Sequence, residues 1–274
     1  MRRAFFSLCL LAVVLVPLSG CQKMRARVEL KKGNELYKEE VYREAMQQFQ
    51  KGLELDPGAT FAWRSVGLSA MAVYRPGAKS AENDKYAQIA IDAFKKFLID
   101  YPRDEKVQDY LMTMLINSER YDDALAMMKT QLTKTPNKPG LSQGIVSTLA
   151  KAGRLDEAYD WALKQAGPPD PVLFYSIGVS CWDKAYYDPM LDSTARGKIV
   201  DTGLAATKKA LDIKPDYFEA MAYYNLLFRE KAKLELDPAK AQEWIAQAEE
   251  WTKKAIALRE QQKAKDAAAM KSPS

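Results

Sequence analysis

Between Val28 and Pro57 the chain reads VELKKGNELYKEEVYREAMQQFQKGLELDP. This segment predicts two short amphipathic helices that are joined by a turn. Small residues, Gly33 and Ala45, stand where the two helices must touch, and the ring of Phe49 fills the space beside them. Pro57 then ends the second helix, because proline lacks a backbone N–H and its ring blocks a further turn. The segment is therefore predicted to fold as one helix-turn-helix unit.

The spacing Ala45-x3-Phe49 followed by Pro57 resembles the tetratricopeptide repeat (TPR), whose pattern runs W-x2-L-G-x2-Y, then A-x3-F, then P. The chain departs from the pattern at Glu29, which stands at the place of the tryptophan. A single unit of this kind cannot bury its apolar face alone, so further copies are expected along the chain.

Further copies follow in phase. Trp63-x2-Val66-Gly67 matches the first half of the pattern, and Ala90-x3-Phe94 matches the second half. Prolines close successive units at a similar relative place, which predicts six units at 28–57, 58–102, 103–136, 137–171, 172–215 and 216–260. The resemblance implies an all-α fold, a right-handed superhelical solenoid of about six repeats spanning residues 28–260. An unrelated helical bundle with accidental periodicity is the alternative.

The second, fifth and sixth units are long, and the sixth, 216–260, spans 45 residues. The spacing between closing prolines is 45 residues from Pro57 to Pro102 and 44 from Pro171 to Pro215, whereas the other spacings are 34 and 35. The extra residues lie between the helices of each unit, so both helices are expected to extend beyond their neighbours.

The N-terminus has the form of a secretory signal peptide over residues 1–20. Arg2 and Arg3 are followed by an apolar run that is shorter than a typical transmembrane helix. The run ends in Leu18-Ser19-Gly20-Cys21, which resembles a bacterial lipobox. The resemblance implies that Cys21 is lipidated and becomes the mature N-terminus. The alternative is an ordinary signal peptide that contains a cysteine.

Residues 21–27 are predicted to form the lipidated cysteine and a short linker, and residues 261–274 a flexible C-terminal tail. Gln22, rather than an aspartate, follows the cysteine. By resemblance to lipoprotein sorting in bacteria with two membranes, this favours the outer membrane, with the protein facing the periplasm. Because the linker is short, the repeats are expected to lie close to the bilayer.

The composition excludes several classes of function. Apolar residues make up 47% of the 274 residues and charged residues 28%, and the net charge of +5 falls to about +3 without Arg2 and Arg3. This charge is too small to predict nucleic-acid binding. The sequence has no histidine, which removes the commonest general base and most zinc sites. We therefore expect no enzymatic activity, no cofactor and no metal, and we expect the remaining Cys181 to be a buried apolar residue without a disulfide partner.

In TPR proteins the first helix of each repeat lines a concave face, and aromatic and arginine residues are frequent binding hot spots. The residues predicted to face inward in this chain are Asn34, Tyr37, Arg64, Met71, Thr113, Asn117, Gln143, Tyr175, Trp182, Tyr223 and Arg229. The alternative for each single residue is packing between neighbouring repeats.

Two functions remain open from the sequence. The first is a non-catalytic, lipid-anchored scaffold that binds an envelope protein or a peptide segment of one. The second is a lipoprotein that binds a small ligand or glycan for uptake, with Trp182, Tyr186 and Tyr187 stacking on the sugar. The sequence does not predict an oligomeric state.

Overall fold

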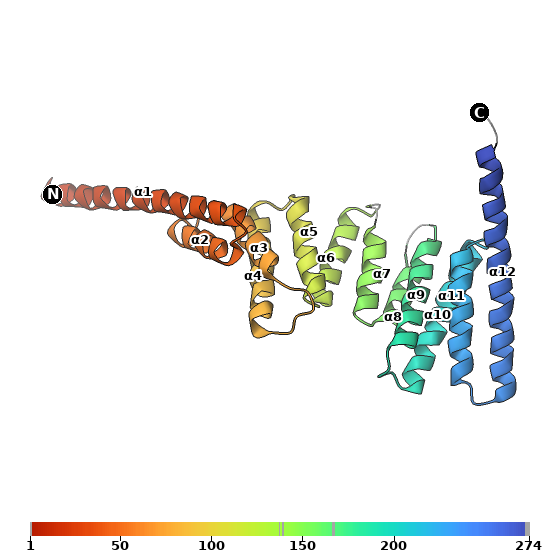
Figure 1. Ribbon diagram of the computed structural model, residues 1–274. Coiled ribbons are helices and arrows are strands. Elements are labelled where there is room, and N and C mark those ends of the chain that lie inside the picture. Colours follow the sequence, from red (N-terminus) through yellow and green to blue (C-terminus); the bar gives the residue numbers. More distant parts are fainter. Residues whose placement is uncertain (1, 137, 139, 166–167, 272–274) are drawn as a thin grey trace. The chain divides into compact units, whose positions relative to one another are not determined.

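The computed structural model describes the backbone of residues 2–136, 138, 140–165 and 168–271, and side chains within residues 20–265. Over these ranges the chain is an all-α array of helix-turn-helix repeats, with 12 helices and no strand (Figure 1). The described helices divide into two compact units, residues 1–124 and 125–274, and the division falls within α6.

Unit 1 begins with one long helix and continues with shorter ones: α1 (Arg2–Lys38), α2 (Tyr42–Leu55), α3 (Ala62–Val73), α4 (Ala81–Asp100), α5 (Glu105–Asn117) and the start of α6 (Tyr121–Lys134). Unit 2 contains the rest of α6 and then α7 (Leu141–Lys151), α8 (Leu155–Leu163), α9 (Pro171–Tyr187), α10 (Ser193–Ile213), α11 (Phe218–Leu234) and α12 (Pro238–Lys271). Each of the six predicted units contains a pair of consecutive helices.

The helix pairs of unit 1 lock together where a glycine of one helix meets a phenylalanine of the next. A Cβ atom placed on Gly33 would lie 2.8 Å from the ring of Phe49, and one on Gly67 would lie 2.4 Å from the ring of Phe94. Both rings are buried, so neither can move aside at little cost. Glycine is therefore required at these two crossings for the helices to approach closely.

The same crossing occurs in unit 2 with different side chains. Gly178 of α9 faces the methyl group of Thr207, which would lie 2.3 Å from an added Cβ atom. Thr207 precedes Pro215 by eight residues, as Phe94 precedes Pro102, so it occupies the place of the repeat's phenylalanine. Its hydroxyl is satisfied by donating to the carbonyl of Gly203 at 2.7 Å. A smaller side chain thus fills this crossing.

The linker prediction was wrong. Residues 22–27 continue α1 without a break, and Ala26 is only 1% exposed because it packs with Leu30 against Gly52 of α2. The contact with α2 favours the helix, since an extended segment would leave this apolar surface in water. Among the residues whose side chains are described, no helix has the length and hydropathy of a membrane span.

The tail prediction was also wrong for residues 261–271, which extend α12. Lysine, alanine and glutamine dominate this stretch and are strong helix formers. Residues 272–274 lie outside the described residues.

The long units differ from each other. In the fifth unit both helices are long, 17 residues in α9 and 21 in α10, as expected. In the second unit α4 has 20 residues but α3 only 12, so the expected extension of α3 was wrong. The extra residues form a loop held by the buried Asn83, which donates to the carbonyls of Arg75 and Ala78 at 2.9 Å and accepts from the N–H of Arg75 at 2.8 Å. In Figure 1 the α9–α10 and α11–α12 turns lie below the lower ends of α7 and α8.

The glycine crossings lead to a stability prediction. Gly67→Ala should destabilise the protein by about 1–3 kcal/mol, because the added methyl group overlaps the ring of Phe94. Gly144→Ala is the matched control, since its methyl group would lie 3.5 Å from the Met128 sulfur, an ordinary contact. This variant should be more stable by about 0.5–1 kcal/mol, because alanine loses less conformational entropy than glycine when it folds into a helix. Urea unfolding followed by circular dichroism measures both, and equal effects of the two substitutions would contradict the crossing as a constraint.

Candidate binding groove

The six predicted groove residues of unit 1 do not form a joined surface feature. Asn34 and Thr113 are exposed, and the others are partly buried. No hydrogen bond, ion pair or ring contact described for unit 1 links any two of them; this set is Asn34, Tyr37, Arg64, Met71, Thr113 and Asn117.

Two of these residues, Tyr37 and Asn117, make other contacts. Tyr37 meets Tyr42 edge to face, with ring centroids 5.1 Å apart. The backbone carbonyl of Asn117 accepts a hydrogen bond from the Tyr74 hydroxyl at 2.6 Å, which ties α3 to α5. Arg64 is partly buried, and its Nε has no partner among the described residues. Tyr37 thus packs against the second helix of its own predicted repeat, 28–57, and this contact does not join neighbouring repeats.

In unit 2, by contrast, three of the five predicted residues come together. Tyr175 and Trp182 of α9 both contact Tyr223 of α11 edge to face, at 5.7 and 5.6 Å between ring centroids. Trp182 also stacks on Tyr186 at 5.0 Å and meets Tyr187 at 5.8 Å, and Tyr217 meets Tyr175 at 5.0 Å. We call this continuous set the aromatic row: Tyr217, Tyr175, Tyr223, Trp182, Tyr186 and Tyr187.

Helical spacing explains the row. Tyr175, Trp182 and Tyr186 lie seven and four residues apart, so α9 presents them on one face toward α11. Exposure rises along the row from 9% at Tyr217 to 68% at Tyr187. One end of the row is thus a packing contact between repeats, and the other end is open to a partner.

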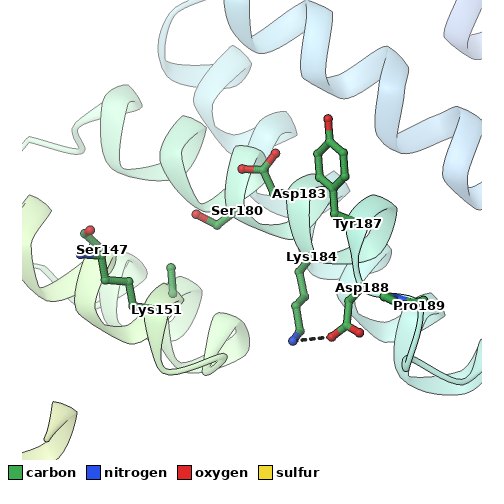
Figure 2. A pocket seen from close by; sticks show the side chains of 9 residues that line it. Ser147, Lys151, Ser180, Asp183, Lys184, Tyr187, Asp188 and Pro189 are labelled. Carbon is green, nitrogen blue, oxygen red and sulfur yellow. Dashed lines mark ion pairs between the residues drawn. The ribbon is translucent and has the colours of Figure 1, made fainter. Parts of the chain in front are cut away.

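A cleft lined by both apolar and polar groups lies on the other side of α9, facing α7 (Figure 2). Its volume is about 770 Å³, and Figure 2 shows Ser147 and Lys151 of α7 opposite the side chains of α9. The full lining is Ser147, Ala150, Lys151, Ser180, Asp183, Lys184, Tyr187, Asp188 and Pro189. Tyr187 belongs to both the cleft and the aromatic row, so the two form one surface, which we call the unit 2 groove.

Gln143 lies beside this cleft and joins its two walls. Its side-chain nitrogen donates to the hydroxyl of Ser176 at 2.9 Å, which connects α7 to α9. Its side-chain oxygen is buried without a partner among the described residues. Gln143 therefore holds the spacing of the two helices that bound the cleft.

The pKa values of two carboxylates in the cleft are shifted in opposite directions. Partial desolvation raises the pKa of Asp183, whose side chain is still exposed to solvent and for which no ion pair is described. The Lys184 ammonium, 2.6 Å away, lowers the pKa of Asp188, and the N–H of Met190 adds to this effect. Asp183 is consequently the carboxylate whose charge a partner could satisfy.

Arg229 does not belong to the unit 2 groove. Its Nε donates to Asn225 at 3.2 Å, and its side chain lines a separate cleft between α11 and α12. Six residues separate it from Tyr223, which places the two on different faces of α11.

Sequence reasoning missed the polar residues of the groove, namely Ser147, Ser180 and Asp183. The signal available was a stripe on α9, in which Ser176, Ser180, Asp183 and Tyr187 recur at helical spacing. In the sequence, such a stripe cannot be distinguished from an ordinary solvent-exposed helix face. Only the position of α7 opposite it identifies a cleft.

The cysteine and the potential metal ligands are the remaining groups that could carry chemistry. Cys181 is buried, as predicted, and burial raises the pKa of its thiol to about 12, with a further contribution from the Asp156 charge. The described residues hold no group of three or more potential metal ligands. The glycan alternative requires Trp182, Tyr186 and Tyr187 to line one pocket. Of these three, only Tyr187 lines the cleft between α7 and α9.

No family model and no curated protein matches the chain. Among solved structures, it is similar to YrrB, a TPR protein with an unusual peptide-binding site, at 24% identity and a TM-score of 0.39, over 70% of this chain and 88% of the other. A TPR repeat protein from Bacteroides fragilis is 14% identical with a TM-score of 0.42, over 74% and 97%. MamA from Desulfovibrio magneticus RS-1 is 13% identical with a TM-score of 0.31, over 87% and 97%.

The two carboxylates of the cleft give a paired prediction. The raised pKa of Asp183 means that its ionisation opposes folding, so the penalty grows as pH rises above the ordinary aspartate value. Asp183→Asn should therefore raise Tm at pH 7. The lowered pKa of Asp188 means that its charge favours folding above that value and that this contribution is lost in acid.

Asp188→Asn should accordingly lower Tm at pH 7, and the difference should shrink as pH falls toward about 3. Thermal unfolding by circular dichroism across this pH range measures both variants. A lower Tm at pH 7 for Asp183→Asn would show that its carboxylate has a partner in solution.

Proposed function

We propose that this chain is a non-catalytic scaffold that binds an extended segment of another protein in the unit 2 groove. The observation that supports this function is the continuity of the aromatic row with the cleft at Tyr187. Clustered aromatic side chains that are partly exposed are frequent anchors for protein partners.

The two halves of the groove suit different parts of such a segment. The open end of the aromatic row, Trp182, Tyr186 and Tyr187, offers ring surface to apolar or proline side chains of the partner. In the cleft, the hydroxyls of Ser147 on α7 and Ser180 on α9 lie where they could form hydrogen bonds with backbone groups of the partner. An extended peptide presents both kinds of group in alternation, which a compact ligand does not.

We further propose that the protein is anchored by a lipid on Cys21 at the periplasmic face of the cell envelope, at the outer membrane. The support is the lipobox-like sequence before Cys21, the exposure of this cysteine and the identity of Gln22. Because Cys21 and Ala26 lie in one helix, the lipid would be about 8 Å along the helix axis from the first packed residue. Unit 1 would thus be held close to the bilayer.

Groove binding is tested by photo-crosslinking in intact cells, with a benzoylphenylalanine probe in place of Ser180. The expected result is one dominant envelope protein crosslinked at this site. Combining the probe with Tyr187→Ala and Trp182→Ala should reduce the crosslinked product about tenfold or more, because the main apolar anchors are lost. The control variant is Tyr101→Ala, an exposed aromatic residue of unit 1.

A second probe at Ala205, an exposed position on α10, reports on contacts outside the groove. Equal crosslinking from both positions would contradict the proposal that the partner binds in the unit 2 groove. If no protein crosslinks at either position while the folded chain is in the membrane, the small-ligand or glycan alternative takes first place.

The anchor is tested by Cys21→Ser, which should move the protein from the membrane to the soluble fraction and abolish incorporation of labelled palmitate. Gln22→Asp should keep the lipid but shift the protein to the inner-membrane fraction. Membrane fractionation with mass spectrometry of the N-terminus distinguishes these outcomes. Retention of Cys21→Ser in the membrane would contradict lipid anchoring.

A further inference from the structure

The turn between α11 and α12 presents an isolated apolar side chain. Leu236 is 96% exposed, and it stands between two acidic residues, Glu235 and Asp237. The Glu235 carboxylate accepts hydrogen bonds from the N–H groups of Leu236 and Asp237, at 3.0 and 3.2 Å. The Asp237 carboxylate accepts one from the N–H of Ala239 at 2.9 Å and caps α12. The turn is therefore ordered, and it holds Leu236 away from its own chain.

A cleft of about 440 Å³ lies beside this turn, between α11 and α12. Its apolar lining includes Ala232, Ala241 and Ile245, and its polar lining includes the basic residues Arg229 and Lys233. The cleft is large enough to hold a leucine side chain. Leu236 of the same chain does not enter it, as its exposure shows.

The charges of the turn and of the cleft are complementary. The turn carries two carboxylates, that of Glu235, which is partly buried, and that of Asp237, which is exposed. In the cleft, Lys233 is paired with the buried Glu230 at 2.6 Å, so its charge is already balanced. Arg229 donates to the neutral Asn225 through Nε, and no carboxylate partner is described for its terminal nitrogens. Arg229 is thus the cleft's uncompensated positive charge.

We propose that a second copy of this chain covers the cleft: Leu236 of each copy enters the α11–α12 cleft of the other, and Glu235 of each copy pairs with Arg229 of the other. Because the turn and the cleft are neighbours on one hairpin, a single two-fold axis brings both contacts into place at once. Each copy then buries one leucine and satisfies one arginine. A lipid surface fits less well, because the acidic residues that flank Leu236 would be driven against headgroups.

The interface is tested on the full chain in detergent, by multi-angle light scattering and sedimentation equilibrium. The native chain should self-associate to a dimer with rising concentration. Leu236→Ser should weaken dimerisation by about tenfold or more, since two leucine side chains lose their burial. Glu235→Lys and Arg229→Glu should each abolish the dimer, because each places like charges in contact.

Mixing these two charge variants provides the decisive measurement. In one half of the mixed pair the introduced lysine of Glu235→Lys meets the introduced glutamate of Arg229→Glu, and in the other half the native Glu235 meets the native Arg229. The equimolar mixture should therefore form a heterodimer, whereas neither variant dimerises alone. Lys233 and Asp237 are left unchanged because they balance Glu230 and cap α12. Glu235 also orders the turn by accepting from the N–H groups of Leu236 and Asp237, so Glu235→Gln, which keeps the accepting oxygen and removes the charge, should weaken the dimer while leaving the turn in place. Glu243→Lys, the same charge change at an exposed position outside the cleft, is the control and should dimerise as the native chain does.

Three results would overturn the proposal. One is a native chain that stays monomeric at several hundred micromolar. Another is a dimer that Leu236→Ser and Glu235→Lys leave unchanged, which would place the interface elsewhere. The third is the absence of a heterodimer in the mixture while circular dichroism shows both variants to be folded.

Discussion

The close approach of two helices at a glycine is the constraint on which the rest of the structure depends. Gly67 lets α3 lie directly against the ring of Phe94, and Gly178 does the same for α9 against Thr207. A Cβ atom at either place would force the helices apart or tilt them. Since side chains leave a helix in fixed directions, fixing the crossing also fixes which residues of α9 face α7 and which face α11.

The length of the hairpins then decides where a partner can bind. α9 has 17 residues and α7 only 11, a difference of about 9 Å along the helix axis. Tyr186 and Tyr187 lie at the C-terminal end of α9, in the turns that the shorter helices lack. The inner rings of the aromatic row are covered by packing and hold the repeats together, whereas the rings on the added turns are open. An insertion in the repeat thus extends a structural contact into the exposed rings of the proposed groove.

The proposed contacts use separate faces of one helix. Tyr223 of α11 meets the rings of α9, while Arg229 lines the cleft toward α12. A dimer formed through the α11–α12 turn would therefore leave Tyr223 in the groove. With the proposed lipid on Cys21, each dimer would carry two anchors, and membrane attachment strengthens steeply when two anchoring groups act at once.

The sequence by itself determined the helical pairs, because glycine, the Ala-x3-Phe spacing and the closing prolines are local signals that each act over one repeat. It also predicted that Tyr175, Trp182 and Tyr223 face inward from first helices, where aromatic residues are frequent binding hot spots. Only the tertiary structure decided that these three touch, that Arg229 faces elsewhere and that Asp183 lies in a cleft. The reason is that a polar stripe such as Ser180 and Asp183 looks the same on a solvated helix as in a groove, and only the opposite wall distinguishes them. Likewise, the helical state of residues 22–27 depends on the contact of Ala26 with α2, which no local pattern reveals.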